Sequence, residues 1–418
     1  MPFAIDLECP ICKKHYGMHD WLQDKCGFRL RINYDLDART NAVDKNKIKS
    51  GHLSHWKYRD FFPLNDKKFE LSTGEGGTSL VKSNRLGEKL GLKNLYFKLE
   101  LSNPSGSFKD RPISVGASMG YENNTPALSA ASSGNAAAAL SSYGAKAGIK
   151  VIVFVPERAS ASKVAQLITL GATVVRVSGG ADSEGDPSVK LFKDACKEFG
   201  WTPCPSFGPF NPHQFEGTKS LAFEMVEQLD WQTPDWVIAN TGSGGLLGGT
   251  AQGFKDWFDL GWIDKMPHMV ACEPEVCAPV VQSFHHKVKP LEFETIHGFP
   301  DTVASGLADP HPWDGDTALE MLYLTKGAAV GVSDEEILKA QRMLASMEGI
   351  FGSPSGMAGL AGIEKLVDDG TIDKNDIVVL PITGHGLKEP QVLEKATKEA
   401  ILCPADIEKL RHELNKKE

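Results

Sequence analysis

Long apolar runs and blocks of like charge are both missing from this 418-residue sequence. No stretch approaches the roughly 18 consecutive apolar residues that a membrane-spanning helix needs. The first residues carry Asp6 and Glu8, whereas a secretory signal would begin with basic residues and continue with an apolar core. The 45 basic and 54 acidic residues are interspersed and give a net charge of -9, which argues against a nucleic-acid or membrane partner. We therefore expect a cytoplasmic protein that acts on small molecules.

Cysteine is also scarce, because eight cysteines in a chain of this length cannot build a disulfide scaffold. Three of them nevertheless follow a pattern near the N-terminus. Cys9 and Cys12 form a C-x2-C pair, and Cys26 follows further along. Tetrahedral zinc takes four ligands from two facing turns of this kind, so the three cysteines resemble most of a zinc ribbon.

The fourth ligand of such a ribbon is missing. Gln23 stands where a fourth cysteine would fall, so zinc would need His15 or His19 as a substitute. The alternative is a ribbon that folds without metal. The sequence therefore predicts a degenerate ribbon-like segment over residues 1–45, assigns no metal to it, and leaves zinc at the three cysteines as the alternative.

Strand-like and helix-like segments alternate along the rest of the chain. Runs of β-branched and apolar residues, of the kind that parallel sheets bury on both faces, predict strands at 151–155, 173–177, 236–239, 269–272 and 377–381. Apolar residues spaced three and four apart predict helices at 136–143, 162–170, 219–229, 335–348 and 356–368. This alternation predicts an α/β fold with two open, mainly parallel sheets flanked by helices.

One stretch, residues 103–111, places a lysine in a turn that opens a helix; its sequence is Asn-Pro-Ser-Gly-Ser-Phe-Lys-Asp-Arg. Ser107 is the expected N-cap, and Asp110 favours the first turn, which alone describes a well-capped helix with a solvated lysine. The other interpretation is a Schiff-base lysine for pyridoxal 5'-phosphate (PLP), a cofactor that needs a lysine held where water is restricted. Lys109 is that candidate.

Two further loops precede helices. Residues 131–136, Ala-Ser-Ser-Gly-Asn-Ala, lead into an alanine-rich helix whose first backbone N–H groups suit a carboxylate, with a simple N-cap as the alternative. Residues 240–249 are rich in glycine and follow a strand, but they lack the lysine of a Walker loop and the spacing of a dinucleotide fingerprint. The second loop therefore predicts a monophosphate site, with a tight packing turn as the alternative.

A last loop, residues 381–388, again follows an apolar strand. The hydroxyl of Thr383 is suited to a pyridine ring nitrogen, which a hydroxyl partner leaves unprotonated. His385 lies between two glycines, and we expect it to make a structural hydrogen bond rather than to act as an acid or base.

In this order the motifs resemble those of the PLP-dependent fold-type II enzymes of the tryptophan synthase beta superfamily, and among them the threonine synthases. The resemblance covers roughly residues 70–395. It rests on Ser-Phe-Lys-Asp-Arg around Lys109, Ser133-Gly134-Asn135, Leu170-Gly171-Ala172, residues 242–245 and residues 383–388. The ribbon-like N-terminus also resembles the degenerate ribbon that precedes many threonine synthases.

The resemblance implies a role for each motif. Lys109 would hold PLP and shuttle protons at the substrate carbons, while Phe108 would flank the cofactor ring. Asn135 would hydrogen-bond the cofactor's 3-hydroxyl group, and Thr383 would meet its ring nitrogen. The residues implied for the cofactor phosphate are Gly242, Ser243, Gly244 and Gly245. Those implied for the substrate carboxylate are Ser132, Ser133, Gly134 and Ala136.

The implied activity is a β,γ-replacement that converts O-phospho-L-homoserine and water to L-threonine and phosphate. Two alternatives remain open: a threonine or serine dehydratase, or related lyase, that eliminates a β-substituent, and an amino-acid-binding homologue without turnover. The resemblance also implies a homodimer. It implies a large PLP-binding domain of residues 46–110 and 209–418, and a small domain of residues 111–208 that closes over the substrate.

The chain departs from the family pattern where the substrate is recognised. Gln214 stands where many threonine synthases place an arginine for the substrate phosphate, and Gly208 stands where an asparagine is usual. Ala136 replaces a threonine after the Gly-Asn pair. Because a lost guanidinium weakens phosphate recognition, the true substrate and leaving group stay open at this point.

Other residues are available to replace that cation or to change the substrate. Lys219, Arg111 and Arg158 are the cations to consider, although each is also suited to a packing or solvated role. Asp309 and Trp313 lie in a loop that is unlike the family pattern, and they would wall a different substrate.

Overall fold

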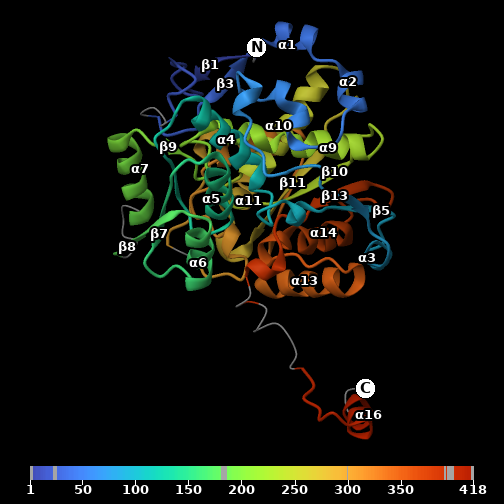
Figure 1. Cartoon of the computed structure of the whole chain (residues 1–418). Coiled ribbons are helices and arrows are strands. Elements are labelled where there is room, and N and C mark those ends of the chain that lie inside the picture. The colour runs from blue at the N-terminus through green and yellow to red at the C-terminus, as the bar shows by residue number, and fades with distance from the viewer. Residues whose placement is uncertain are drawn as a thin grey trace. The chain divides into compact units, whose positions relative to one another are not determined.

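The computed structural model describes residues 3–21, 26–179, 186–298, 300–389, 392 and 400–415. The chain divides into two units, Met1–Lys388 and Glu389–Glu418. The second unit contains the helix α16 (Ile407–Asn415). All other elements named below belong to the first unit (Figure 1). In the described part of the chain, no helix is both long and apolar enough to cross a bilayer.

The larger sheet of the first unit has six strands in the order β12-β11-β10-β13-β5-β4. Their bounds are β12 Ala328–Val332, β11 His268–Pro274, β10 Trp236–Asn240, β13 Ile377–Pro381, β5 Asn94–Lys98 and β4 Leu80–Lys82. Every neighbouring pair is parallel except β4 and β5, which are antiparallel. The carboxyl ends of β5, β13 and β10 therefore meet at one edge of the sheet.

Both faces of this sheet are buried, because successive side chains of β10 enter different cores. Val237 and Ala239 belong to one core, and Trp236 and Ile238 belong to the other. Helices α9 (Ser220–Gln228), α10 (Gly245–Asp259), α11 (Pro279–His285) and α12 (Gly315–Leu324) supply the first core. Helices α3 (Arg85–Lys89), α13 (Asp334–Glu348) and α14 (Ala358–Asp368) supply the second. Figure 1 shows α9 and α10 on one side of the central strands and α13 and α14 on the other.

The smaller sheet is entirely parallel and has the order β8-β7-β6-β9. Its strands are β8 Thr173–Val177, β7 Val151–Pro156, β6 Leu128–Ala131 and β9 Thr202–Pro203. The helices that pack on it are α4 (Asp110–Glu122), α5 (Asn135–Ala147), α6 (Ala161–Thr169) and α7 (Pro187–Phe199). Gly144 of α5 packs against the sheet so closely that a Cβ there would lie 2.1 Å from Val151 Cγ2.

A third, antiparallel sheet lies at the N-terminus with the order β2-β1-β3. Its strands are β1 Ala4–Glu8, β2 His15–Tyr16 and β3 Arg31–Tyr34, and they are followed by α1 (Leu36–Ala42) and α2 (Lys45–Ser50). Leu7, Cys9 and Leu30 form its small core. We call residues 3–34 the ribbon.

The α/β architecture with two mainly parallel sheets is confirmed, and each predicted strand and helix lies at its predicted place within two residues, except the helix predicted at 136–143, which extends to Ala147. In the two larger sheets, the sequence patterns missed β4, β5, β6, β9 and β12. They were also wrong about Ser107, because the N-cap of α4 is Lys109 and no side chain caps it. Ser107 instead forms a bridge with Gly384. The boundaries between a large and a small domain stay a prediction.

Candidate active site

Three of the predicted motifs emerge from adjacent parallel strands at the same edge of the larger sheet. The stretch with Lys109 follows β5, the glycine-rich loop follows β10, and the loop with Thr383 follows β13. Open α/β sheets bind ligands beyond the carboxyl ends of their strands. Sheet topology therefore gathers motifs that lie more than a hundred residues apart in the sequence.

The loops around Lys109 and Thr383 are joined by backbone contacts. Phe108 N donates to Thr383 O at 2.9 Å, and His385 N donates to Gly106 O at 3.0 Å. Gly106 has φ +79°, a left-handed conformation that favours glycine. The helix that follows thus begins at a fixed position relative to Thr383.

Asn135 lies beside the loop that contains Thr383. Its Nδ2 is 3.5 Å from the position that a Cβ on Gly384 would take. Asn135 is the first residue of α5, which follows β6 of the smaller sheet. The structure therefore brings the smaller sheet's loop to the Thr383 loop through Asn135.

Lys109 projects into a cleft and contacts one hydroxyl group there. Its Nζ donates to Ser206 Oγ at 2.9 Å and lies 4.7 Å from the centroid of the Phe108 ring. Burial lowers the pKa of Lys109 from 10.5 to about 8, and the carboxylates of Asp314 and Asp309 oppose that shift. A larger fraction of the amine is therefore neutral near pH 7 than for a solvated lysine.

Ser206 itself is held in an unusual conformation. Its φ is 66°, which is uncommon for a residue other than glycine and costs energy. Ser206 N donates to Gln214 Oε1 at 2.9 Å. The side chain of Gln214, on α8 (Pro212–Thr218), thus helps to hold the serine that contacts Lys109.

Lys109 lies in a narrow cleft that is open to solvent. Its lining includes Phe108, Lys109 and Asp314. Residues 214, 215 and 218 of α8 and the start of α10 also line it. Gln214 Nε2 is buried and has no hydrogen-bond partner among the described residues. The cleft thus offers one amine, one unused amide donor and one carboxyl group to a ligand.

The glycine-rich loop comes close to other backbone at Gly242 and Gly244. Gly244 has φ +93°, and a Cβ there would lie 2.7 Å from Asp314 O. A Cβ on Gly242 would lie 3.1 Å from Leu307 Cα. Because α10 begins at Gly245, the first amides of this helix have no intrahelical acceptor and form a site suited to a phosphate group. Ser243 and Gly245 are partly exposed beside them.

A cation that the sequence patterns missed lies next to the cleft. Arg29 of the ribbon places its guanidinium carbon 3.7 Å from the centroid of the Phe215 ring. Its Nη2 donates to Thr317 Oγ1 at 2.9 Å, and its Nε lies 3.5 Å from Asp314 Oδ1. The unusual glycine at position 208 was the signal that could have revealed it, because a Cβ there would lie 2.1 Å from Arg29 Cδ.

Two carboxyl groups beside Lys109 have raised pKa values. Burial raises the pKa of Asp314 to about 6, although Arg29 opposes the shift, and burial raises the pKa of Asp309 to about 7. Asp314 lines the cleft, and Trp313 stacks on Phe207 with ring centroids 5.8 Å apart. The loop that contains Asp309 and Trp313 thus reaches the cleft through Asp314, a residue that the sequence patterns did not single out.

Of the four residues predicted to bind the substrate carboxylate, Ser132, Ser133 and Gly134 lie on the turn between β6 and α5. Ser132 Oγ accepts from Gly134 N at 3.2 Å, and Ser133 and Gly134 are partly exposed. Ala136 is buried in α5 at 5% exposure. None of these four residues lines the cleft around Lys109, so the structure does not place them there.

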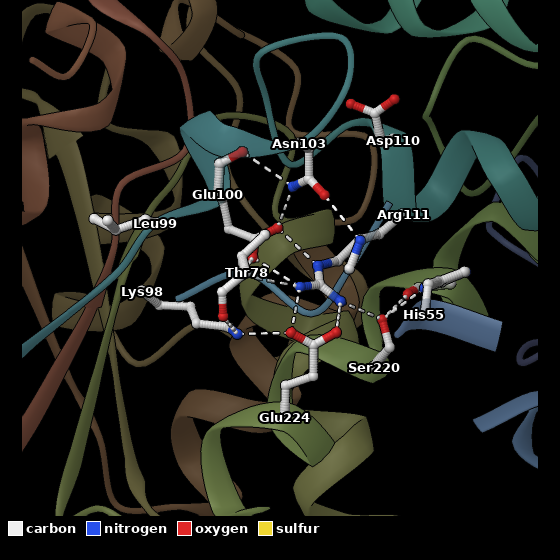
Figure 2. Close-up of polar contacts among 12 residues, drawn as sticks. His55, Thr78, Lys98, Leu99, Glu100, Asn103, Asp110, Arg111, Ser220 and Glu224 are labelled. Atoms are coloured by element: carbon white, nitrogen blue, oxygen red, sulfur yellow. Dashed lines mark hydrogen bonds and ion pairs between the residues drawn. The ribbon is translucent and has the colours of Figure 1, made fainter. Parts of the chain in front are cut away.

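Arg111, one of the three cations considered from the sequence, is committed to a buried ion-pair network (Figure 2). Its Nε donates to Glu100 at 2.7 Å, and its Nη1 donates to Glu224 at 2.7 Å. Lys98 Nζ also donates to Glu224, at 2.6 Å. Each of these four side chains is fully buried, so the network anchors the first turn of α4 to α9 and β5.

The remaining alternatives have structural roles or lie at the surface. Lys219 pairs with Glu216 at 2.5 Å and with Asp256 at 3.0 Å, while Arg158 is exposed after β7. The Nδ1 atom of His385 accepts from Leu387 N at 3.2 Å, as expected for a structural hydrogen bond.

The three N-terminal cysteines do come together. The sulfur atoms of Cys9, Cys12 and Cys26 all lie within 4.8 Å of one another. Gln23, which stands in place of a fourth cysteine, lies outside the described residues. His15 Nδ1 lies 2.8 Å from Asp6 Oδ2.

Comparison with known proteins places these features in a family. The model of the family described as pyridoxal-phosphate dependent enzyme matches residues 71–384. The curated threonine synthase of Methanocaldococcus jannaschii is 35% identical over 96% of this chain and 98% of its own length. That of Methanosarcina acetivorans is 35% identical over 97% of each. A solved L-serine ammonia-lyase from the fungus Rhizomucor miehei has the same fold, with a TM-score of 0.64 and 21% identity over 78% of this chain and 98% of that chain.

Proposed function

Because the chain belongs to the family of pyridoxal-phosphate dependent enzymes and is a lyase similar to threonine synthases, we propose that it converts O-phospho-L-homoserine and water to L-threonine and phosphate. The observation that carries the proposal is the site of Lys109. An amine of lowered pKa lies in a cleft that also contains the start of the glycine-loop helix, as a PLP site requires.

Lys109 is the residue that holds PLP in this proposal, and Phe108 flanks the cofactor ring. Gly242, Ser243, Gly244 and Gly245 hold its phosphate, which is supported by the lack of room for any side chain at Gly244. Asn135 would hydrogen-bond the 3-hydroxyl group of PLP, and Thr383 would meet its ring nitrogen. This is supported by the bond from Phe108 N to Thr383 O and by the position of Asn135 beside Gly384. When bound, PLP supplies an electron sink for the bonds at the substrate Cα.

The chain's own groups then move protons and restrict water. Once the substrate amine has displaced its amine from PLP, Lys109 would take a proton from the substrate carbon and return it, because a pKa of about 8 for the free amine suits both directions near neutral pH. Ser206 Oγ holds the amine in position. The rings of Phe108 and Phe215 line the cleft and limit the water that reaches the amine. Ser132 and Ser133 receive the substrate carboxylate as the cleft closes.

Arg29 supplies the cation that Gln214 cannot supply. It contacts Phe215 and Asp314, which both line the cleft, and the glycine at position 208 leaves room for it. Gln214 Nε2 adds a neutral donor to the same region. In this proposal the substrate phosphate binds to Arg29 and Gln214, and the ribbon therefore completes the active site.

Product analysis of the purified enzyme tests this function. With PLP and O-phosphohomoserine, we expect equal amounts of phosphate and threonine, and no turnover by the Lys109→Ala variant. Keto acid from threonine, with O-phosphohomoserine inert, would select the dehydratase instead. A protein that binds amino acids but turns over neither compound would select the inactive homologue. The homodimer, the cytoplasmic location, the role in threonine biosynthesis and the closing of a small domain stay predictions.

A further inference from the structure

We propose that Cys9, Cys12 and Cys26 bind one thiophilic divalent cation, with zinc as the expected metal. The three sulfur atoms lie within 4.8 Å of one another. Zinc–sulfur bonds of about 2.3 Å place the sulfur atoms of a tetrahedral site about 3.8 Å apart, so small movements of the side chains would complete the site. No disulfide joins cysteines in the described part of the chain.

Two separate turns deliver these sulfur atoms. Cys9 and Cys12 lie on the turn between β1 and β2, where Lys13 N donates to Cys9 O at 3.1 Å. Cys26 lies on another turn shortly before β3. The residue after Cys12, Lys13, has φ 60°, and the residue after Cys26, Gly27, has φ +79°. Both turns therefore reverse immediately after a cysteine, which aims the three sulfur ligands at one point.

The chemistry of the donors selects the metal. Three thiolates favour zinc and other soft cations over magnesium or calcium, which prefer oxygen ligands. The histidine beside the site is engaged, since His15 Nδ1 contacts Asp6 at 2.8 Å. Three protein ligands leave one position for water, and Cys12 is exposed, so solvent can reach that position.

A metal here has a clear structural task. The core of the ribbon consists of Leu7, Cys9 and Leu30, which is too little apolar burial to hold such a segment rigidly. The ribbon nevertheless makes defined contacts: Met18 O lies 2.7 Å from His213 Nε2, and Arg31 Nη2 donates to Glu320 at 2.6 Å. A cation that ties the two turns together would stabilise the folded ribbon and so keep Arg29 beside the cleft.

Metal content tests the proposal without any substrate, so its outcome does not depend on the proposed function. The full-length protein is purified with zinc in the medium and without chelators, and zinc is measured by mass spectrometry of the element and of the native protein. We expect one zinc per chain in the wild type and in Cys403→Ser, whose cysteine lies in the second unit. We expect the bound zinc to be lost in the Cys12→Ser and Cys26→Ser variants.

Cobalt provides a second measurement in case a variant fails to fold. The wild-type protein is stripped of metal under reducing conditions and titrated with Co²⁺ alone. We expect sulfur-to-cobalt charge-transfer absorption that saturates at one equivalent and disappears when zinc is added. A wild type without bound zinc, with no such absorption, would overturn the proposal, as would full zinc content in both the Cys12→Ser and Cys26→Ser variants.

Discussion

Arg29 occupies the space that a side chain at Gly208 would need: a Cβ on Gly208 would lie 2.1 Å from Arg29 Cδ. The two residues are far apart in the sequence, and only one of them lies in the ribbon. Gly208, which departs from the threonine synthase pattern, thus leaves room for Arg29. Arg29 lies outside residues 71–384, the region that the family model matches.

The Gly208→Asn substitution should therefore harm the protein even though asparagine is usual at this position in the family. The added side chain overlaps both Arg29 and Asp314 Oδ1, and such overpacking costs about 1–3 kcal/mol. We expect a lower midpoint of thermal unfolding and a raised KM for O-phosphohomoserine. An unchanged midpoint together with unchanged kinetics would show that Arg29 is free to leave this place without cost.

The Arg29→Met substitution tests the cation directly. It keeps the stem of the side chain but removes the guanidinium, whose charged hydrogen bonds are worth about 1.5–3 kcal/mol. We expect KM for O-phosphohomoserine to rise roughly tenfold to a hundredfold, with a smaller change in kcat, and competitive inhibition by inorganic phosphate to weaken in parallel.

Arg31→Met is the matched control for that experiment. Arg31 lies in the same ribbon and pairs with Glu320, but its side chain is 42% exposed, so the pair contributes little. We expect its KM to match that of the wild type. If both substitutions raised KM equally, the ribbon would only pack against the rest of the first unit and would not bind substrate. Because Arg29→Lys keeps the positive charge, we expect it to raise KM less than Arg29→Met does.

The apoprotein should gain stability with rising pH because of Lys109. Its folded-state pKa of about 8 lies below the ordinary value of 10.5, so the unfolded chain binds more protons between these two values. Burial of the charged amine therefore lowers the free energy of unfolding by its full amount below pH 8. This destabilisation decreases as the pH rises from 8 towards 10.5.

The Lys109→Met variant isolates this effect. Compared with wild-type apoprotein, we expect it to be more stable by about 1–3 kcal/mol at pH 7, and the difference to shrink at pH 9.5. Denaturant unfolding of both apoproteins across this range measures it. A difference that does not change with pH would contradict the lowered pKa.

Breaking the buried ion-pair network should unfold the protein rather than alter its specificity. Arg111→Met leaves the carboxylates of Glu100 and Glu224 with Lys98 as their remaining buried cation, and such uncompensated charge costs about 3–5 kcal/mol. We expect a large fall in the free energy of unfolding by denaturant. Arg158→Met, at an exposed position, should leave it nearly unchanged.

The sequence predicted the fold well where a segment's own pattern is strong. The β-branched run at β13 and the amphipathic spacing of α13 gave the correct elements, because burial on one or both faces leaves a visible period. The antiparallel edge strand β4 and the glycine-containing strand β12 have weaker patterns, and they were missed. Ser107 was wrongly expected to cap α4 because its neighbours Gly106 and Phe108 hydrogen-bond to a loop that follows a strand far along the chain.

The sequence by itself determined which groups are available: a lysine in a turn, a glycine-rich loop after a strand, and three cysteines with ribbon-like spacing. Tertiary structure decided which of them meet. Parallel pairing of β5, β13 and β10 brings the lysine and both loops to one edge, and the packing of α4 against α9 holds Arg111 in a buried network. Tertiary structure also places Arg29 beside Gly208. Such contacts between distant segments depend on how whole elements pack, so they leave no local pattern in the sequence.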